Sequence, residues 1–169
     1  MKLNMLISDL TPQECRDMLT RIGFGRLACA RDNQPYIVPI YFAYEFDLLY
    51  GFTTVGRKIK WMRTNPKVCL AVDEVLSHFR WMSVIVMGRY EELPNKAKFR
   101  REREHALVAL EKRMPLWWRT AIAVKQSPTR HKDAEPLFYR IHIDSMTGHR
   151  AFPDAVKSKI GRADKERTT

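Results

Sequence analysis

The chain has 169 residues, of which 45% are hydrophobic, and it carries a formal net charge of +11. This length and composition fit one globular domain with its own core and exclude a disordered chain. No apolar run approaches the ~20 residues that a membrane-spanning helix needs, and the N-terminus lacks the features of a secretion signal, so we expect a cytoplasmic protein without a membrane span.

The positive charge is concentrated in one part of the chain. Residues 94–134 carry 11 basic and 4 acidic side chains, whereas residues 1–93 carry 12 and 10. A basic segment can bind nucleic acid, but it is more often a solvated helix face. Nucleic-acid binding is therefore the weaker interpretation of this segment.

The first half of the chain predicts one helix followed by short strands. A helix is expected over residues 8–22, because Thr11 and Glu14 have the spacing of a capping box, Pro12 suits the first helical position and Gly23 ends the pattern. Apolar and β-branched residues predict strands over 25–30, 35–44 and 48–53, with turns at 31–34 and 45–47. Pro39 lies inside the second of these strands. Because proline cannot donate to a ladder, we expect an edge position, a bulge or a ligand there.

The second half predicts a helix, two long strands, a charged helix and a last strand. The expected ranges are a helix over 56–64, strands over 68–75 and 81–92, a helix over 95–113, a loop over 125–135, a strand over 136–143, a turn over 145–150 and a polar tail over 154–169. Hairpin-length turns separate several strands. We therefore expect a mainly β protein with flanking helices, built as a small antiparallel barrel in one domain over residues 1–153.

Residues 53–58 have the composition of a phosphate site at the junction of a strand and a helix. Thr53 and Thr54 supply two hydroxyls, and Gly56 lets the backbone approach a ligand closely. The first turn of the next helix offers free N–H groups and the positive end of its dipole. Arg57 can bind phosphate through two hydrogen bonds, and Lys58 adds a point charge. Taken alone, the segment also fits a helix start with solvated basic residues.

Several spaced motifs around this segment resemble one protein family. They are Gly25-Arg26-Leu27-Ala28, Gln34 to Tyr44 with its central Val38-Pro39-Ile40-Tyr41, Gly56-Arg57-Lys58, Asn65-Pro66-Lys67-Val68-Cys69 and Trp81 to Arg89. Their order resembles the pyridoxamine 5′-phosphate oxidase-related proteins of the FMN-binding split-barrel superfamily, including the nitroimidazole-resistance type. The resemblance covers residues 8–93 and, more loosely, 136–150.

The resemblance implies a fold, a cofactor and a site. The fold is a six-stranded antiparallel split β-barrel that forms a homodimer, with FMN at each of two sites between the subunits. The phosphate would lie on Thr53, Arg57 and Lys58. The isoalloxazine ring would lie along Val38, Pro39, Ile40 and Tyr41 and bind backbone groups, while Trp81 and Ser83 would line the pocket, partly from the second subunit.

The sequence also departs from the family pattern. Relatives often carry a His-Ser pair where this chain has Phe52-Thr53, and the C-terminal substrate motif of the true oxidase has no match. We identify no obligate acid or base, although His149 could reach a flavin across the dimer, and Trp117-Trp118 could form a substrate lid or, more simply, a core or dimer contact. No metal-site spacing is present, and Cys15, Cys29 and Cys69 predict buried, reduced thiols.

Three hypotheses of function follow. The first is an FMN-dependent oxidoreductase of unknown substrate, with NADH or NADPH as a possible electron donor. The second is a non-catalytic protein that binds or stores a flavin, the deazaflavin F420 or haem. The third, and weakest, is a module that binds an anionic partner such as nucleic acid.

Overall fold

The computed structural model describes residues 4–113 and 137–154. The elements in chain order are β1 (Met5–Asp9), α1 (Pro12–Ile22), β2 (Phe24–Arg31), β3 (Gln34–Tyr41), β4 (Ala43–Glu45), β5 (Leu48–Thr53), α2 (Arg57–Thr64), β6 (Lys67–Ser77), β7 (Arg80–Leu93), the 3₁₀ turn η1 (Ala97–Phe99), α3 (Arg100–Arg113) and β8 (Leu137–Pro153). The expected loop over 125–135, Trp117-Trp118 and all but the first residue of the expected tail over 154–169 lie outside the described residues.

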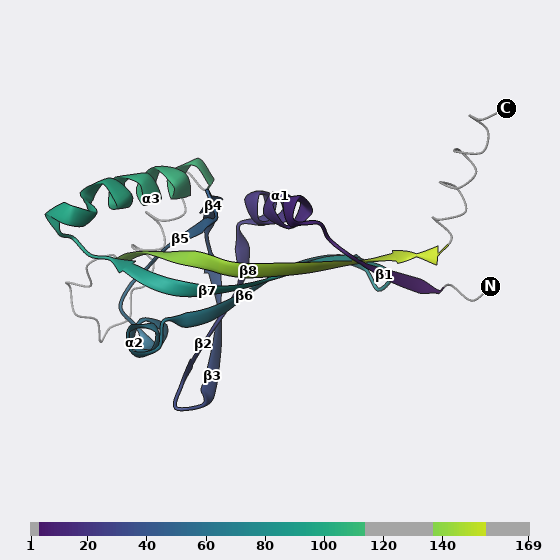
Figure 1. The fold of residues 1–169 in the computed structure, drawn as a ribbon, viewed down its shortest axis with the longest axis horizontal. Helices are drawn as coiled ribbons and strands as arrows, with labels where there is room; N and C mark the ends of the chain where they lie inside the picture. Colours follow the sequence, from purple (N-terminus) through teal and green to yellow (C-terminus); the bar gives the residue numbers. More distant parts are fainter. Residues whose placement is uncertain (1–3, 114–136, 155–169) are drawn as a thin grey trace, which may run out of the picture.

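The strands form one antiparallel sheet that returns on itself (Figure 1). Its order is β3-β2-β6-β7-β8-β5-β4, and β1 pairs with β8. The strands at the two ends of this order, β3 and β4, are consecutive in the chain and are separated by Phe42 alone. The strand expected over 35–44 is therefore interrupted, and it closes a barrel by pairing with β2 on one side and β5 on the other. Counted with β3 and β4 as one strand and without β1, the barrel has the six strands of the predicted split barrel.

The local signals at the start of α1 are confirmed, but the helix is shorter than expected. Thr11 and Glu14 form the capping box in both directions, Pro12 is the first helical residue, and Gly23 ends the helix with a left-handed φ of 62°. Ser8 and the residue after it, expected in the helix, instead belong to β1, whose partner is the far end of β8.

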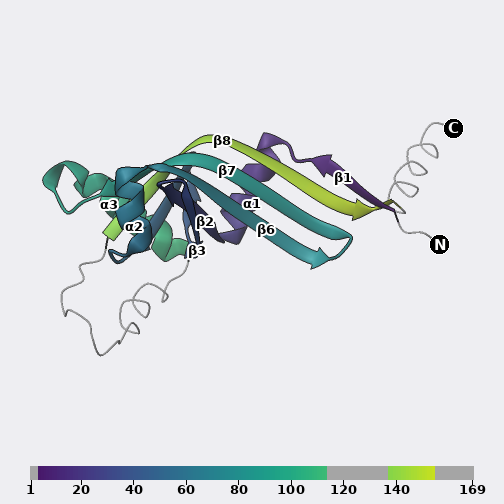
Figure 2. The same ribbon diagram turned by 90° about the horizontal axis from the view of Figure 1, so that it is seen from below.

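The last strand is longer than the sequence predicted. Residues 145–150 were expected to form a turn, yet they pair with β7 throughout. The β6–β7 hairpin, β1 and the far half of β8 form a ribbon that extends beyond the barrel (Figure 2). Gly148 lies where α1 packs on this ribbon: a Cβ there would be 2.7 Å from the Cys15 sulfur and 2.8 Å from a Leu10 methyl. A glycine inside a strand is typical of such a close approach.

Two apolar clusters hold the fold together. The larger fills the barrel and includes residues from α1 and α2, among them Met18, Leu19, Ile59 and Met62. The smaller lies between α3 and the outward face of the sheet, and it comprises Ala43, Tyr50, Phe52, Leu93, Ala106, Ala109, Leu110 and Phe138. Helices α1 and α2 thus pack on the inward side of the sheet, and α3 packs on the outward side. Of the helices that the structure describes, none is both long and apolar enough to cross a bilayer.

Candidate functional site

The predicted phosphate segment lies at the N-terminus of α2. Gly56 is the N-cap residue, no side chain caps the helix, and the first turn contains no acidic residue. The backbone N–H groups and the positive dipole end are therefore available to an anion. Thr53 is the last residue of β5, and its hydroxyl donates a hydrogen bond to the carbonyl of Thr54, the next residue, at 3.2 Å.

The protein itself gives no steric reason for a glycine at position 56. Its φ of −142° and ψ of −166° are extended values that other residues adopt. Among the described residues, a Cβ there would meet only the Thr54 carbonyl oxygen, at 4.0 Å, so these residues leave the space in front of Gly56 open. An open approach to uncapped backbone amides fits the phosphate of a flavin.

Two basic side chains complete this segment and connect it to β2 and β3. The Arg57 guanidinium lies 5.4 Å from the centre of the Tyr36 ring on β3. Within residues 4–113 and 137–154, Arg57 forms no ion pair. Burial raises the pKa of the Cys29 thiol on β2, and the nearby charge of Lys58 opposes that rise. Arg57 thus connects this segment to β3, the strand that was predicted to carry the flavin ring, and Lys58 lies near β2.

The position of Pro39 follows from the pairing of β3. This strand lies at one end of the sheet order and pairs with β2 through a two-residue turn at Asp32 and Asn33, whose φ angles are 51° and 59°. The pair that closes such a turn exchanges both hydrogen bonds, and the pattern alternates from there. Pro39 consequently falls at a position whose amide would point away from β2. Of the three alternatives for Pro39, the edge position is confirmed, and the backbone groups of Ile37 share its direction.

The four predicted ring residues divide between the two faces of β3. Val38 and Ile40 belong to the barrel interior, whereas Pro39 and Tyr41 alternate onto the outward face. Of this strand, the free edge and the outward face are thus the parts that a planar ring could contact. The side chains of Val38 and Ile40 support the strand from beneath.

Trp81 and Ser83 lie on the same outward face, but at a distance from β3. Pro39 pairs with Arg26 of β2, Arg26 pairs with Ala71 of β6, and Ala71 pairs with Ile85 of β7. Ser83 and Trp81 lie two and four residues before Ile85 in β7, so their side chains are on the same face as that of Ile85. Three strand spacings amount to about 14 Å. Within one subunit, these two residues therefore lie apart from Pro39.

His149 joins this outward face. It was expected in a turn, but it lies in β8 and is paired directly with Ser83 on one side and Asp9 on the other. Its Nε2 is 3.4 Å from an Asp9 carboxylate oxygen, and its side chain is about half exposed. An imidazole therefore stands next to one of the predicted flavin-lining residues.

Packing beneath α3 explains why a phenylalanine is found at position 52. Its ring lies in the cluster beneath α3, with its centre 5.1 Å from that of Phe138. Phe52 is here part of an apolar layer. His105 of α3 also contacts this region: its Nε2 lies 2.9 Å from a Glu45 carboxylate oxygen, and the centre of its ring is 5.2 Å from that of Tyr50.

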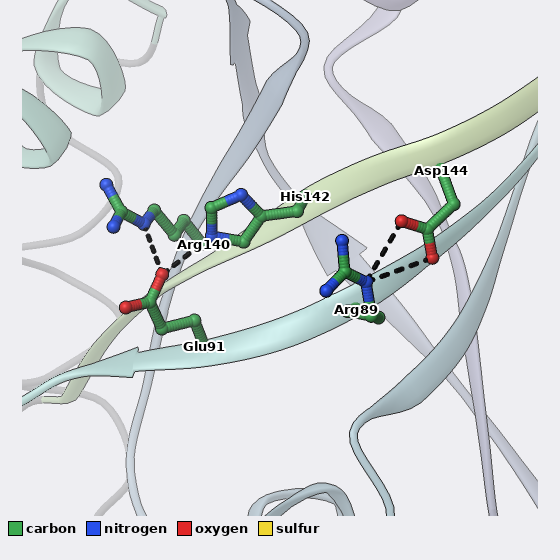
Figure 3. A network of polar contacts seen from close by, with 5 residues as sticks. All are labelled: Arg89, Glu91, Arg140, His142 and Asp144. Carbon is green, nitrogen blue, oxygen red and sulfur yellow. Dashed lines mark hydrogen bonds and ion pairs between the residues drawn. The ribbon is translucent and has the colours of Figure 1, made fainter.

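The outward face of β7 and β8 ends in a charged network, shown in Figure 3. Glu91 accepts a hydrogen bond from Arg140 at 2.7 Å and lies 2.6 Å from Nε2 of His142, while Arg89 binds Asp144 at 3.0 Å. Hydrogen bonding from Arg140, more than that from His142, holds the pKa of Glu91 below its usual value. Opposite charges on adjacent strands were the sequence signal that could have revealed the network.

Comparison with known proteins places this geometry in a family. The sequence profile described as pyridoxamine 5′-phosphate oxidase matches residues 11–150. An uncharacterized protein of Rhizobium meliloti (strain 1021) is 42% identical over 148 residues, which cover 87% of this chain and 97% of that protein.

Solved structures agree with this assignment. The crystal structure of a protein from Mesorhizobium loti, described as FAD-binding, is 42% identical with a TM-score of 0.70, and the match covers 88% of this chain and 98% of that one. A putative 5-nitroimidazole antibiotic resistance protein from Bacteroides thetaiotaomicron shares the fold, with 20% identity, a TM-score of 0.66, and coverage of 90% and 92%. The profile match, the relatives and the split barrel agree: this chain belongs to the pyridoxamine 5′-phosphate oxidase family.

Proposed function

We propose that the protein is a homodimeric, FMN-dependent oxidoreductase that acts on a small substrate. The observation that carries the proposal is the juxtaposition of two features within one subunit. The uncapped N-terminus of α2, with Arg57, lies beside the free edge of β3, and Arg57 is 5.4 Å from the ring of Tyr36. A ligand with a phosphate at one end and a planar hydrogen-bonding ring at the other matches both. The 42% identical relative from Mesorhizobium loti, described as FAD-binding, supports a flavin.

The residues of this chain would bind and orient the cofactor. Arg57 and Lys58 supply positive charge, and the amides of α2 and the Thr53 hydroxyl supply hydrogen bonds to a phosphate. The free edge of β3 offers backbone groups to the pyrimidine edge of the ring, which would fix its orientation. A bound flavin supplies two-electron redox chemistry, with NADH or NADPH as the expected donor.

A second copy of the chain would complete the site. Ile37 and Met87 on the outward face are 60% and 52% exposed, although both are large and apolar. Contiguous exposed apolar surface is typical of an interface. Packing two such faces together would cover this surface, and it would bring Trp81, Ser83 and His149 of one subunit toward the phosphate segment of the other.

Flavin binding is tested by reconstitution. The purified protein should be yellow, or should take up FMN with quenching of flavin fluorescence. Arg57→Ala removes a charge-assisted contact worth about 1.5–3 kcal/mol, so FMN should bind roughly 10- to 150-fold more weakly. Lys60→Ala removes the same charge from the middle of α2 and should change the affinity less than about threefold. Wild-type protein that binds no flavin would refute the proposal, and equal losses in the two variants would refute the phosphate assignment.

Turnover requires a separate measurement, because Phe52 favours a second candidate function. Phe52 is buried beneath α3 and can act as neither acid nor base at a position where the family resemblance often implies a histidine. A protein that holds flavin but fails to oxidise NADH or NADPH with any acceptor would be a non-catalytic flavin carrier. Flavin reduction by either nucleotide, followed in a stopped-flow spectrometer, would identify an oxidoreductase and its donor.

A further inference from the structure

Two hollows lie beside the proposed phosphate segment, residues 53–58. The smaller, of about 190 Å³, begins at Val55 within that segment and continues past Arg63 of α2 to the end of β7. The larger, of about 310 Å³, lies against α3 and the residues that precede it. Asn95 and Arg103 line both, so the two hollows adjoin and lead from the phosphate segment to α3.

The larger hollow has an apolar floor beneath a fixed guanidinium. Leu107 of α3 and Phe138 of β8 line it, and the guanidinium carbon of Arg103 lies 5.1 Å from the centre of the Phe138 ring. Arg103 donates a hydrogen bond to the Leu93 carbonyl at 2.8 Å, which holds the guanidinium in place. Guanidinium planes and aromatic side chains both stack on flat ring systems. The larger hollow therefore suits a planar aromatic base.

The same hollow carries more positive than negative charge. Three cations line it, Lys96, Arg100 and Arg103, against one carboxylate, Glu104. Arg100 pairs with Glu104 at 3.0 Å, but both side chains are mostly exposed, so the pair is weak and the guanidinium stays accessible to an anion. Among residues 4–113 and 137–154, Lys96 forms no ion pair. A phosphate group matches the unbalanced charge of Lys96 and the accessible guanidinium of Arg100.

The larger hollow lies toward the phosphate end of the proposed flavin site. None of the residues proposed to contact the flavin ring lines either hollow. A small substrate that reacts at the ring would therefore make no use of them. A nicotinamide dinucleotide differs, because its reactive ring and its adenosine lie at opposite ends of an extended molecule. Its adenosine can be held at a distance from the flavin ring, and NADPH differs from NADH only by a phosphate on the 2′ oxygen of that adenosine.

We infer that the larger hollow binds the adenosine 2′-phosphate end of NADPH, so that the protein prefers NADPH to NADH as its electron donor. The adenine would pack on Arg103 and Phe138, and the 2′-phosphate would lie on Lys96 and Arg100. The rest of the dinucleotide would extend along the smaller hollow toward the flavin. The volume of the larger hollow lies within the range that small-molecule sites occupy. This inference rests on the proposed flavin-dependent function.

The binding experiment compares 2′,5′-ADP, which carries the 2′-phosphate, with 5′-AMP, which lacks it. Isothermal titration calorimetry measures both dissociation constants on the full chain with saturating FMN, which would occupy the phosphate segment. Lys96→Glu reverses the unbalanced charge, and Arg103→Met removes the guanidinium but keeps an apolar stem on Phe138. Lys98→Glu is the matched control, because it makes the same charge change two residues away on η1, outside the lining of both hollows.

We expect wild-type protein to bind 2′,5′-ADP about tenfold or more tightly than 5′-AMP. This ratio should fall toward one in Lys96→Glu and stay unchanged in Lys98→Glu, whereas Arg103→Met should weaken both nucleotides by about tenfold, because it removes a stacking surface of the base. Circular dichroism shows whether each variant is folded. A wild-type ratio near one, or binding of neither nucleotide, would overturn the inference, as would equal ratios in Lys96→Glu and Lys98→Glu.

Reduction of bound FMN, followed by stopped-flow absorbance, separates this inference from the proposed function. The NADPH concentration that gives half the maximal rate should rise about tenfold in Lys96→Glu, and that of NADH should change less than about threefold. Equal concentration dependence for the two donors in the wild type would overturn the inference and leave an FMN-dependent oxidoreductase intact. Wild-type protein that binds 2′,5′-ADP but no FMN would refute the proposed function, and with it the role of the hollow as a donor site.

Discussion

The outward face of the sheet differs between its two ends. Over β5, the end of β7 and the start of β8, helix α3 lies on the face and buries Tyr50, Phe52 and Phe138. Over β2, β3, β6 and the first half of β7, no helix of the described residues lies on that face, and large side chains such as Ile37 and Met87 are more than half exposed. At both ends, every second residue of the strands points to this outward face, and several of these residues are apolar.

We expect the covered end to contribute mainly to the stability of the subunit and the open end mainly to dimer formation. At the covered end, α3 buries the apolar surface of the sheet within the subunit, and residues there, such as Phe52, contribute to packing. At the open end, none of the described residues covers the same surface, and we expect a second subunit to cover it. The residues assigned to the flavin ring lie at this open end, so cofactor binding and dimer formation are expected to depend on it.

Truncation at the covered end should have the largest effect. Phe52→Ala removes a ring from a packed apolar layer, and such substitutions cost about 3–5 kcal/mol of unfolding free energy. Urea denaturation measures the loss. Val108→Ala, on the exposed side of α3, should change the value by less than about 0.5 kcal/mol. A loss below about 1 kcal/mol in Phe52→Ala would mean that α3 does not depend on this layer.

A charge on the open face should separate the subunits with little effect on the fold. Met87→Glu places a carboxylate in the surface that the proposed dimer buries, where an unpaired charge is costly. We expect the dimer dissociation constant to rise by about tenfold or more, measured by sedimentation velocity over a concentration series. Val108→Glu is the control, because it adds the same charge to an exposed apolar position on α3. Equal behaviour of the two variants would place the interface elsewhere.

The sequence revealed local structure better than long-range pairing. Thr11 and Glu14 identified the start of α1 because a capping box depends on four neighbouring residues. The edge position of Pro39 was among the expected alternatives for the same reason, since proline restricts its own strand. By contrast, β1 was missed and residues 145–150 were taken for a turn, because both are ordered by pairing with distant strands.

The candidate site shows the same limit. The strand-to-helix junction at residues 53–58 has a local signature, and in the structure Arg57 of this segment lies 5.4 Å from the centre of the Tyr36 ring on β3. That Trp81 and Ser83 lie three strands from Pro39 depends on the sheet order, which no local pattern contains. His149 next to Ser83, and the hollows that begin at Val55, likewise arise from segments far apart in the chain.

The helix that covers the inward side of the ribbon gives a pH-dependent test. Glu14 accepts hydrogen bonds from the backbone and hydroxyl of Thr11 at 2.8 and 3.0 Å and pairs with Arg150 of β8. These contacts, the Thr11 backbone first, lower the pKa of Glu14 from 4.5 to about 2. A depressed carboxyl pKa stabilises the folded state above the unfolded value, and this stabilisation is lost as pH falls through the folded value.

The unfolding free energy of the wild type should therefore fall between pH 4.5 and about 2, in part because Glu14 becomes protonated. Glu14→Gln cannot titrate, so it should be less stable at neutral pH and show a shallower fall over that range. Urea denaturation at a series of pH values measures both. Arg150→Gln keeps the Thr11 contacts and should give an intermediate slope. A Glu14→Gln slope equal to that of the wild type would contradict the assignment.

The hydroxyl groups of Tyr90 and Tyr139, inside the barrel, give the test with the smallest expected effect. It asks whether buried polar groups of the barrel have hydrogen-bond partners. The rings of Tyr90 and Tyr139 are 5.6 Å apart. The Tyr90 hydroxyl donates to Glu92 at 3.2 Å, whereas the buried Tyr139 hydroxyl has no hydrogen-bond partner among the described residues. Burial raises the pKa of both phenols, so both are neutral at physiological pH.

Removing the two hydroxyls should consequently have opposite effects. Tyr90→Phe deletes a hydrogen bond to a carboxylate and should lower the unfolding free energy by about 1–2 kcal/mol. Tyr139→Phe deletes a hydroxyl that loses its hydration on folding without a replacement, so stability should stay the same or rise by up to about 1 kcal/mol. Thermal and urea denaturation of the pair, at one protein concentration, give the comparison. A loss in Tyr139→Phe as large as that in Tyr90→Phe would mean that the Tyr139 hydroxyl has a partner, such as a buried water, and that the barrel interior is not dry at this point.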